Sequence, residues 1–381
     1  MGTDLARRCG MTVVVLFWVS VAIPVYAYIG YPVLLVLLGL VIRRPVGRAP
    51  VEPMVSLLVP AYNEERVIAA KIHNALSLDY PADRLEVVIA CDGSQDRTAE
   101  IARQLADGVR VRVAAYPVNR GKIVAMNDTV PGLRGDIVVL SDASSVLATD
   151  AVRRLVTNFA DARVGAAGGS YSVVQPDAVA LGRSEDFYWR YETFLKTRES
   201  DLGSTIGAHG QLHAIRRELY PFPSPGTIND DYVIPLSVVA RGYRAVYDPR
   251  AVSYEPAHEM TGFARRVRIA RGNIQQLREI RRLLWPPRPL PVLFFVSHKV
   301  LRLVVPFAMA AALVTNALIL GRPLYRVVFA GQVAFYLVAL VGAGRHLRPR
   351  ILGIPSYFTM INSAVFVALL QAMVGRRTAW K

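Results

Sequence analysis

Cysteine and lysine are both scarce in this sequence of 381 residues. The two cysteines, Cys9 and Cys91, stand far apart in the chain, which excludes a disulfide framework and a CxxC zinc site. Lysine occurs at only five positions, so arginine supplies nearly all of the positive charge behind the formal net charge of +16. Hydrophobic residues make up 53% of the chain. This apolar content excludes intrinsic disorder and, together with the charge, argues against an ordinary soluble enzyme.

Charge is absent from a long segment near the N-terminus. No charged residue lies between Arg8 and Arg43, and a helix needs only about 20 apolar residues to cross the hydrocarbon core. We therefore predict a transmembrane helix over residues 9–42, and not a signal peptide, whose apolar region is typically about 7–15 residues long. Pro24 and the turn-like Gly30-Tyr31-Pro32 predict a kink or a break, so a two-pass hairpin stays an alternative.

A second apolar block lies near the C-terminus. Three runs at 303–320, 327–344 and 351–375 carry no charge, which predicts three more transmembrane helices within residues 303–375. Residues 286–302 are also apolar but contain charged side chains, which predicts an amphipathic helix at the membrane interface. Within its part 289–302 the charged or titratable residues are His298, Lys299 and Arg302. We expect Arg278, Arg281 and Arg282 before it to face anionic lipid headgroups.

Residues 44–285 have the size and pattern of one α/β domain. Short β-branched runs at 55–59, 85–90, 109–114 and 136–140 alternate with helical segments, which predicts a parallel, doubly wound sheet. Ligands of such sheets bind at the carboxyl ends of the strands, where three of these four runs are followed by acidic or amide-rich loops. Basic residues after the first apolar run predict a cytoplasmic domain, although three later spans would then leave the basic C-terminal tail outside.

Two aspartates stand at the ends of predicted strands. Asp92 can accept hydrogen bonds from a nucleobase or ribose, or it can cap the following helix, and the sequence leaves both open. Asp142 follows a hydrophobic strand, where an isolated carboxylate needs a cation or a donor beside it. We therefore expect Asp142 to bind a hard cation that bridges a diphosphate. Arg120 and Lys122 stand on either side of Gly121, and two cations beside a glycine suit the binding of a phosphate group.

The ordered loops of this domain resemble the nucleotide-sugar loops of family 2 glycosyltransferases with the GT-A fold. The resemblance rests on PAYNEE (60–65), CDGSQDRT (91–98), NRGKIVAMN (119–127) and SDAS (141–144), followed by similar segments at 207–219, 229–236, 242–249 and 265–276. It covers about residues 50–280, and the apolar blocks are similar to the layout of bacterial hyaluronan, chitin, cellulose and poly-N-acetylglucosamine synthases.

This resemblance implies a Rossmann-like α/β GT-A domain in a multi-pass protein of the bacterial inner membrane. The implied activity is inverting transfer of a sugar from a UDP-sugar to a growing extracellular polysaccharide, with transfer of one sugar to a lipid or lipid-linked acceptor as the alternative. Nucleic acid is not an expected partner, because the basic residues gather beside the membrane segments and the chain contains no recognised nucleic-acid motif.

The resemblance also assigns roles to individual residues. Asp231 would be the general base that takes the proton from the acceptor hydroxyl. Asp142 would bind Mg²⁺ or Mn²⁺, but Ser144 stands where the family has the second aspartate of its D-x-D motif, which leaves one carboxylate plus diphosphate oxygens and water. The implied donor-binding residues are Pro60, Tyr62, Glu64, Asp92, Lys122, Asp142 and Ser144, and the implied acceptor-binding residues are His209, Gly210, Gln211, Asp230 and Ile269.

Residues 265–269 stand where processive synthases carry Q-x-x-R-W. Arg268 keeps the arginine, which suits bidentate contact with a diphosphate and is the second expected catalytic residue. Ile269 replaces the tryptophan and cannot stack on an acceptor sugar as an indole would. We therefore expect sugar transfer, and leave polymer extension and single transfer both open.

Overall fold

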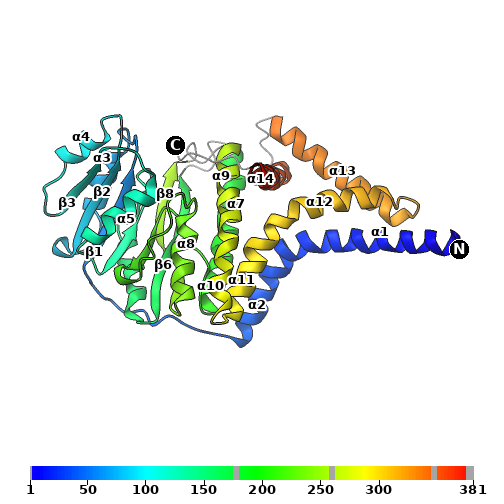
Figure 1. Cartoon of the computed structure of the whole chain (residues 1–381), viewed down its shortest axis with the longest axis horizontal. Helices are drawn as coiled ribbons and strands as arrows, with labels where there is room; N and C mark the ends of the chain where they lie inside the picture. The colour runs from blue at the N-terminus through cyan, green and yellow to red at the C-terminus, as the bar shows by residue number, and fades with distance from the viewer. Residues whose placement is uncertain (1, 175–179, 257–261, 345–349, 375–381) are drawn as a thin grey trace.

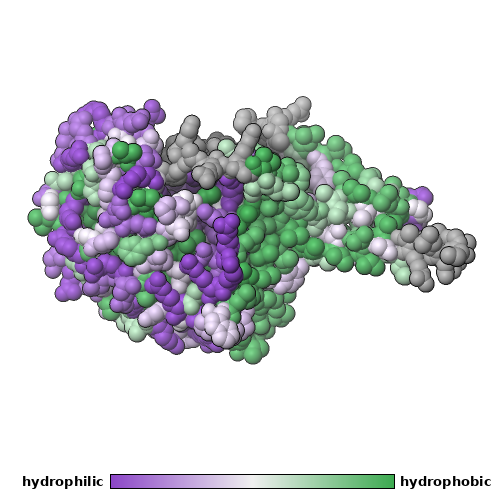
Figure 2. Space-filling view, viewed as in Figure 1, coloured by the Kyte–Doolittle hydropathy of each residue, from purple (hydrophilic) through white to green (hydrophobic). Residues whose placement is uncertain are grey.

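The computed structural model describes residues 2–174, 180–256, 262–344 and 350–374. An α/β domain lies at one end of the molecule, and long helices from the two chain termini extend from its other end (Figure 1). The surface changes from mostly hydrophilic on the α/β domain to mostly hydrophobic over these helices (Figure 2). The expected separation into a polar domain and apolar segments is therefore visible in the fold.

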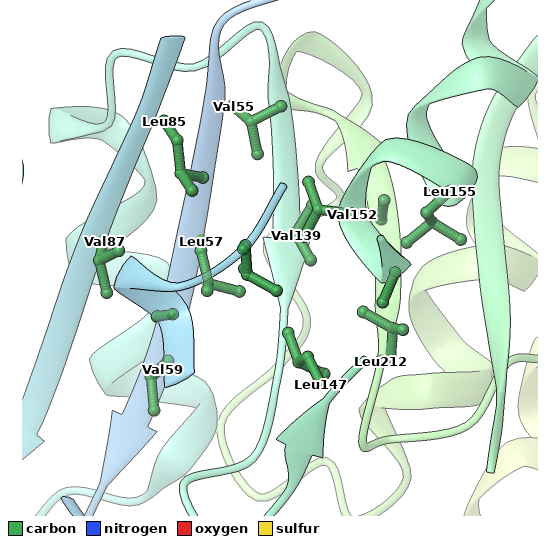
Figure 3. Packing of buried hydrophobic residues seen from close by; sticks show 14 of the residues in the cluster. Val55, Leu57, Val59, Leu85, Val87, Val139, Leu147, Val152, Leu155 and Leu212 are labelled. Atoms are coloured by element: carbon green, nitrogen blue, oxygen red, sulfur yellow. The ribbon is translucent and has the colours of Figure 1, made fainter. Parts of the chain in front are cut away.

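The first half of the sheet consists of four parallel strands in the order β3-β2-β1-β4. They are β1 (Val55–Ala61), β2 (Leu85–Asp92), β3 (Val111–Tyr116) and β4 (Ile137–Leu140), each within three residues of its predicted start and end. The helices between them are α3 (Ile68–Leu76), α4 (Thr98–Gln104) and α5 (Lys122–Thr129). Strands β1 and β2 are buried throughout because helices cover both faces, and Figure 3 shows their Val and Leu side chains packed in the core.

The second half of the sheet is mixed, so the prediction of a parallel sheet is wrong beyond β4. Strand β7 (His213–Arg216) runs antiparallel to β4 and to β6 (Val164–Val174), while β6 is parallel to β8 (Arg244–Pro256). The short β5 (Val146–Leu147) pairs antiparallel with β8 at the edge. The remaining helices of the domain are α6 (Ala151–Val156), α7 (Ala180–Asp201), α8 (Asp230–Ala240), α9 (Phe263–Gln276) and α10 (Arg281–Leu284).

Four helices in the described ranges are long and apolar enough to cross a membrane: Gly10–Val41, Pro289–Ala317, Pro323–Gly342 and Gly353–Met373. The first combines α1 (Gly2–Val25), a π-helical turn (Tyr26–Gly30) and α2 (Tyr31–Val41). It continues through the turn without reversing, so the two-pass hairpin is wrong, whereas the kink is confirmed (Figure 1). The third and fourth contain α13 (Pro323–Gly344) and α14 (Arg350–Met373).

The predicted interfacial segment differs from the structure. Helix α11 (Pro289–Phe295), a π-helical turn (Val296–Val300) and α12 (Leu301–Ala317) form one continuous apolar helix, so no boundary exists at residue 302. His298 is buried against α7 and Lys299 against the Tyr232 ring of α8, so neither lies on a free face. The burial of His298 was not predictable, because the two carboxylates that meet it lie about 100 positions earlier in the sequence. Arg278, Arg281 and Arg282 are exposed, and their contact with lipid headgroups stays a prediction.

Candidate functional site

A cavity of about 420 Å³ opens at the carboxyl ends of β1 and β4 and is bounded by α7, α8 and α9. Its wall contains every site residue expected from the sequence except one. These are Pro60, Tyr62, Glu64, Lys122, Asp142, Ser144, His209, Gly210, Gln211, Asp230, Asp231, Arg268 and Ile269. Residues from β1 to α9 thus meet in one place. It lies at the carboxyl ends of strands, where ligands of α/β sheets bind.

Asp92 is the exception, since it does not line the cavity. Its buried carboxylate accepts hydrogen bonds from the backbone N–H groups of Arg120 and Gly121, at 3.0 Å and 2.7 Å. Asp92 therefore does not cap the following helix, which is instead supported by Asp96 accepting a bond from the backbone N–H of Thr98. In this structure Asp92 fixes the loop that carries Lys122 toward the cavity.

Lys122 is paired with two carboxylates. Its Nζ donates to Asp142 Oδ1 at 2.9 Å and lies 3.2 Å from Asp230 Oδ2. Burial alone would lower the pKa of Lys122, but these two charges raise it above its ordinary value. Burial would likewise raise the pKa of Asp142, whereas Lys122 holds it below its ordinary value. Asp230 stands in the first turn of α8 and directs its carboxylate to Lys122, which differs from a simple helix cap.

Lys71 of α3 holds the loop after β4 in place by hydrogen bonds. Lys71 Nζ donates to Ser141 Oγ and to the backbone carbonyl of Ser145, both at 2.7 Å. Asp142 is thereby held at the cavity, where Gly210 leaves space between it and Asp231. A Cβ placed on Gly210 would lie 3.7 Å from Asp142 Oδ2 and 4.0 Å from Asp231 Oδ2. The two carboxylates therefore face a common space, and a glycine keeps that space open.

Asp231 lies on the cavity wall at the start of α8. Burial and then the charge of Asp230 together raise the pKa of its carboxyl to about 6, against the opposing effect of nearby lysines. The next residue, Tyr232, is contacted on its ring by Lys299 Nζ at 3.5 Å and by Lys196 Nζ at 5.0 Å from the ring centre. A carboxylate with a pKa near neutrality, in a cavity, is suited to accepting a proton.

Glu255 on β8 lines the same cavity and was missed by the sequence reasoning. Its Oε1 accepts a hydrogen bond from Ser144 Oγ at 3.1 Å, and its Oε2 accepts one from Gln211 Nε2 at 3.3 Å. Burial raises the pKa of Glu255 above its ordinary value, and the charge of Asp142 adds to this effect. A second carboxylate thus stands beside the serine that replaces the expected aspartate. Its sequence signal was weak, because β8 also contains Asp248 and two arginines.

An aromatic group forms another part of the wall. His209 is buried and contacts Trp189 edge-on with ring centres 5.1 Å apart, and it also contacts Tyr171 and Tyr247. Burial, with the charge of Lys196, lowers the pKa of His209 well below its ordinary value, so the imidazole is neutral. Trp189 on α7 lines the cavity, and its indole Nε1 is buried without a hydrogen-bond partner among the described residues. The sequence reasoning missed this tryptophan because it belongs to none of the recognised motifs.

Helix α9 closes the cavity on the side of the apolar helices. Asn229 Nδ2 donates to the Ile269 carbonyl at 3.2 Å and to Asn273 Oδ1 at 3.1 Å, which fixes α9 against the start of α8. Gly272 permits this approach, because a Cβ there would lie 2.4 Å from Asn229 Cγ. Arg268 and Ile269 are consequently held at the cavity beside Asp230 and Asp231.

This chain is similar to known glycosyltransferases. A family model described as glycosyltransferase like family 2 matches residues 53–278. A β-monoglucosyldiacylglycerol synthase of Trichormus variabilis is 38% identical over 176 residues, which is 44% of this chain and 36% of that protein. A poly-β-1,6-N-acetyl-D-glucosamine synthase of Staphylococcus aureus is 26% identical over 230 residues, which is 58% of this chain and 55% of that protein. The chain therefore matches about half or less of the length of these curated relatives.

A solved structure matches almost the whole chain. It is the mannosyltransferase PcManGT from Pyrobaculum calidifontis in complex with GDP-Man and Mn²⁺, with 25% sequence identity and a TM-score of 0.74. The match covers 94% of this chain and 99% of that one, so it includes the apolar helices as well as the α/β domain.

Proposed function

The chain belongs to the glycosyltransferase like family 2, and on that premise we propose that it transfers a sugar from a UDP-sugar to an acceptor hydroxyl with inversion at the anomeric carbon. The single observation that carries this proposal is the cavity in which Asp142, Lys122 and Asp231 meet. We further propose that the protein lies in a bacterial inner membrane with its catalytic domain in the cytoplasm. Four candidate spans and the basic residues that follow the first of them support this location.

Asp231 is the proposed general base. The acceptor oxygen attacks the anomeric carbon as the bond to the donor diphosphate breaks, and Asp231 takes the hydroxyl proton. The raised pKa makes the carboxyl a stronger base than an exposed aspartate while leaving it ionised at neutral pH. Arg268 and Lys122 lie on the same wall, where their charges would stabilise the departing diphosphate.

The carboxylates at the cavity suit a divalent cation better than the single aspartate of the SDAS motif does. No group of three or more His, Cys, Asp or Glu side chains that could hold a metal occurs among the described residues. Asp142 and Glu255 nevertheless both line the cavity, and Glu255 accepts a hydrogen bond from Ser144, two residues after Asp142. We propose that these two carboxylates, with diphosphate oxygens, hold Mg²⁺ or Mn²⁺. The cation would supply positive charge to the diphosphate leaving group.

For the donor, we propose that Pro60, Tyr62 and Glu64 contact the uracil and ribose. Pro60 lies at the end of β1, Tyr62 and Glu64 follow the strand, and all three line the cavity. Asp92 takes part by holding the 119–121 loop in place, and it reaches the nucleotide only if that loop moves. A guanine nucleotide is the alternative, because the matched mannosyltransferase was solved with GDP-Man.

For the acceptor, we propose a lipid or lipid-linked molecule. The cavity wall includes Lys299 of the apolar helix 289–317, so it extends to the segments that would lie in the membrane. Ile269 offers no stacking surface for a polymer at the family's usual position. Extension of an extracellular polysaccharide is the second candidate, and Trp189 favours it, because an indole in the wall can stack on an acceptor sugar.

A nucleotide-release assay on the purified protein in lipid nanodiscs tests this function. The donors to compare are UDP-glucose, UDP-N-acetylglucosamine, UDP-glucuronate and GDP-mannose. A UDP-sugar with an added diacylglycerol or lipid-linked acceptor is expected to give release well above the acceptor-free rate. Chromatography of the labelled product then separates the two acceptors: one sugar on an organic-soluble lipid supports single transfer, whereas a long water-soluble glycan supports polymerisation. If GDP-mannose is turned over and none of the three UDP-sugars is, the proposed UDP-sugar donor is wrong.

A further inference from the structure

A second, smaller cavity of about 60 Å³ adjoins the catalytic one on the side of the apolar helices. Tyr188, Asn273 and Lys299 line both cavities, so these three side chains stand at the junction. The far wall of the small cavity comes from the candidate spans and includes Tyr28, Leu303 and Val365. The space thus connects the reaction centre with the part of the fold that would lie in lipid.

Lys299 is the buried cation at this junction. Only 9% of the residue is exposed, and its Nζ lies 3.5 Å from the centre of the Tyr232 ring. No carboxylate oxygen comes within 4.0 Å of Lys299 among the residues that the structure describes. A buried ammonium is costly unless it is paired, and the face of one aromatic ring replaces only part of its lost hydration.

The neighbouring charges do not supply the missing partner. Glu192 is already engaged on both oxygens, by His298 Nε2 at 3.1 Å and by Arg302 Nη1 at 2.5 Å. Arg302 also lines the small cavity, and its Nε and Nη2 are buried without hydrogen-bond partners in the described part of the chain. Asn362 lines the same space with its Oδ1 likewise unpaired. Among the described side chains that line this space, unpaired donor atoms therefore outnumber unpaired acceptor atoms.

We propose that this small cavity is an anion subsite in which Lys299 and Arg302 bind a phosphate group carried by the acceptor. The inference rests on the proposed function and narrows its acceptor to a molecule with a hydroxyl group and a phosphate. A phosphate offers oxygen acceptors to the unpaired N–H groups of Arg302 and a counter-charge to Lys299. Hydrocarbon chains of the same molecule would then lie along the apolar helices.

The subsite also gives the acceptor a defined position. Lys299 packs on Tyr232, which directly follows the proposed base Asp231 in α8. A phosphate held at Lys299 would therefore place a hydroxyl further along the same molecule in the catalytic cavity. Fixing one end of a substrate in this way lowers the entropy lost in bringing the reacting atoms together.

Direct lipid binding tests the subsite without turnover. Native mass spectrometry of the full chain in detergent would compare dioleoyl phosphatidic acid with dioleoylglycerol, which has the same chains but lacks the phosphate. Phosphatidic acid is expected to bind more tightly by roughly 10- to 100-fold, the range of a charge-assisted hydrogen bond. Lys299→Met is expected to remove that preference. Arg281→Met removes the same charge from an exposed position and is expected to retain it.

Competition with inorganic phosphate shows whether the subsite binds the phosphate group by itself or only as part of a lipid. If excess inorganic phosphate displaces phosphatidic acid, the phosphate group itself is bound, and if it does not, the group is recognised only as part of a lipid. Both results support the subsite. Equal binding of the two lipids, binding of neither, or an unchanged preference in Lys299→Met would overturn it. Nucleotide release from a UDP-sugar in the same variant separates this failure from a failure of the proposed glycosyl transfer.

Discussion

The Tyr31 hydroxyl donates a hydrogen bond of 2.6 Å to Glu199 Oε1, joining the first apolar helix to α7 across 168 positions of sequence. Glu199 also contacts His298 Nδ1 at 2.7 Å, so one buried carboxylate connects three segments. Helix α7 carries Trp189 and Glu192 in the cavity wall. The apolar helices are therefore attached to the catalytic domain by polar contacts that also fix the site.

Loss of the Tyr31 hydroxyl should weaken the contact between the first apolar helix and α7. Tyr31→Phe leaves the buried Glu199 with one donor fewer, which is expected to destabilise the protein by about 1–3 kcal/mol. Thermal unfolding in detergent measures the effect. Tyr26→Phe is the matched control, because the Tyr26 hydroxyl meets neutral Ser297 in a partly buried site and should cost less. Equal stability of Tyr31→Phe and wild type would show that the Glu199 contact adds nothing.

Removal of the proposed base should abolish turnover without loss of donor binding. Asp231→Asn keeps the size of the side chain but cannot accept a proton, and the rate of sugar transfer is expected to fall roughly 100- to 10,000-fold. UDP binding, followed by calorimetry, should change little. Full activity of this variant would require another residue to be the base.

The rate should depend on pH through the same carboxyl. Because burial raises the pKa of Asp231 to about 6, the group is protonated and inactive as a base below that value and ionised above it. We therefore expect kcat/KM to rise with pH to a plateau above about pH 6–7, when it is measured with a metal concentration that saturates at each pH. A flat profile between about pH 5 and pH 8 would contradict the assignment.

Glu255 should matter for metal binding. Glu255→Gln keeps the contact with Ser144 but removes a charge, and Mn²⁺ binding in the presence of UDP is expected to weaken by roughly 10-fold or more. Electron paramagnetic resonance reports free Mn²⁺ directly and does not require turnover. Adding Ser144→Asp to this variant restores a second carboxylate and should recover binding. Unchanged affinity in Glu255→Gln would exclude Glu255 as a ligand.

Trp189 should contribute to acceptor affinity. Trp189→Ala removes the indole from the cavity wall and is expected to raise the acceptor KM by roughly 3- to 10-fold with little change in the donor KM. Trp189→Phe should retain part of the affinity. Trp285→Ala, at a position 85% exposed, is the matched control. A rise in the donor KM instead would place Trp189 at the nucleotide.

Much of the fold was predictable because its signals are local. Charge-free runs marked the candidate spans, and buried β-branched runs marked the first four strands. The strand directions beyond β4 were not predictable in this way, since local patterns specify a strand but not its neighbour. The expected residues at the ends of β1 and β4 met in one cavity because a parallel sheet brings the carboxyl ends of its strands together, whereas Asp231 and Arg268 reach the cavity on helices α8 and α9.

The sequence by itself determined the family, the separation of polar and apolar segments, and the position of Asp142 and Asp231. Only the tertiary structure decided which groups surround them. Glu255 reaches Ser144 because β5 and β8 pair with Val146 opposite Tyr254, a relation between residues more than 100 positions apart. His298 and Arg302 were expected at a membrane surface, but both pair with Glu192 of α7, and His298 is fully buried. Hydrophobic period and charge are properties of short segments, whereas charge pairing depends on distances that exist only after the chain has packed.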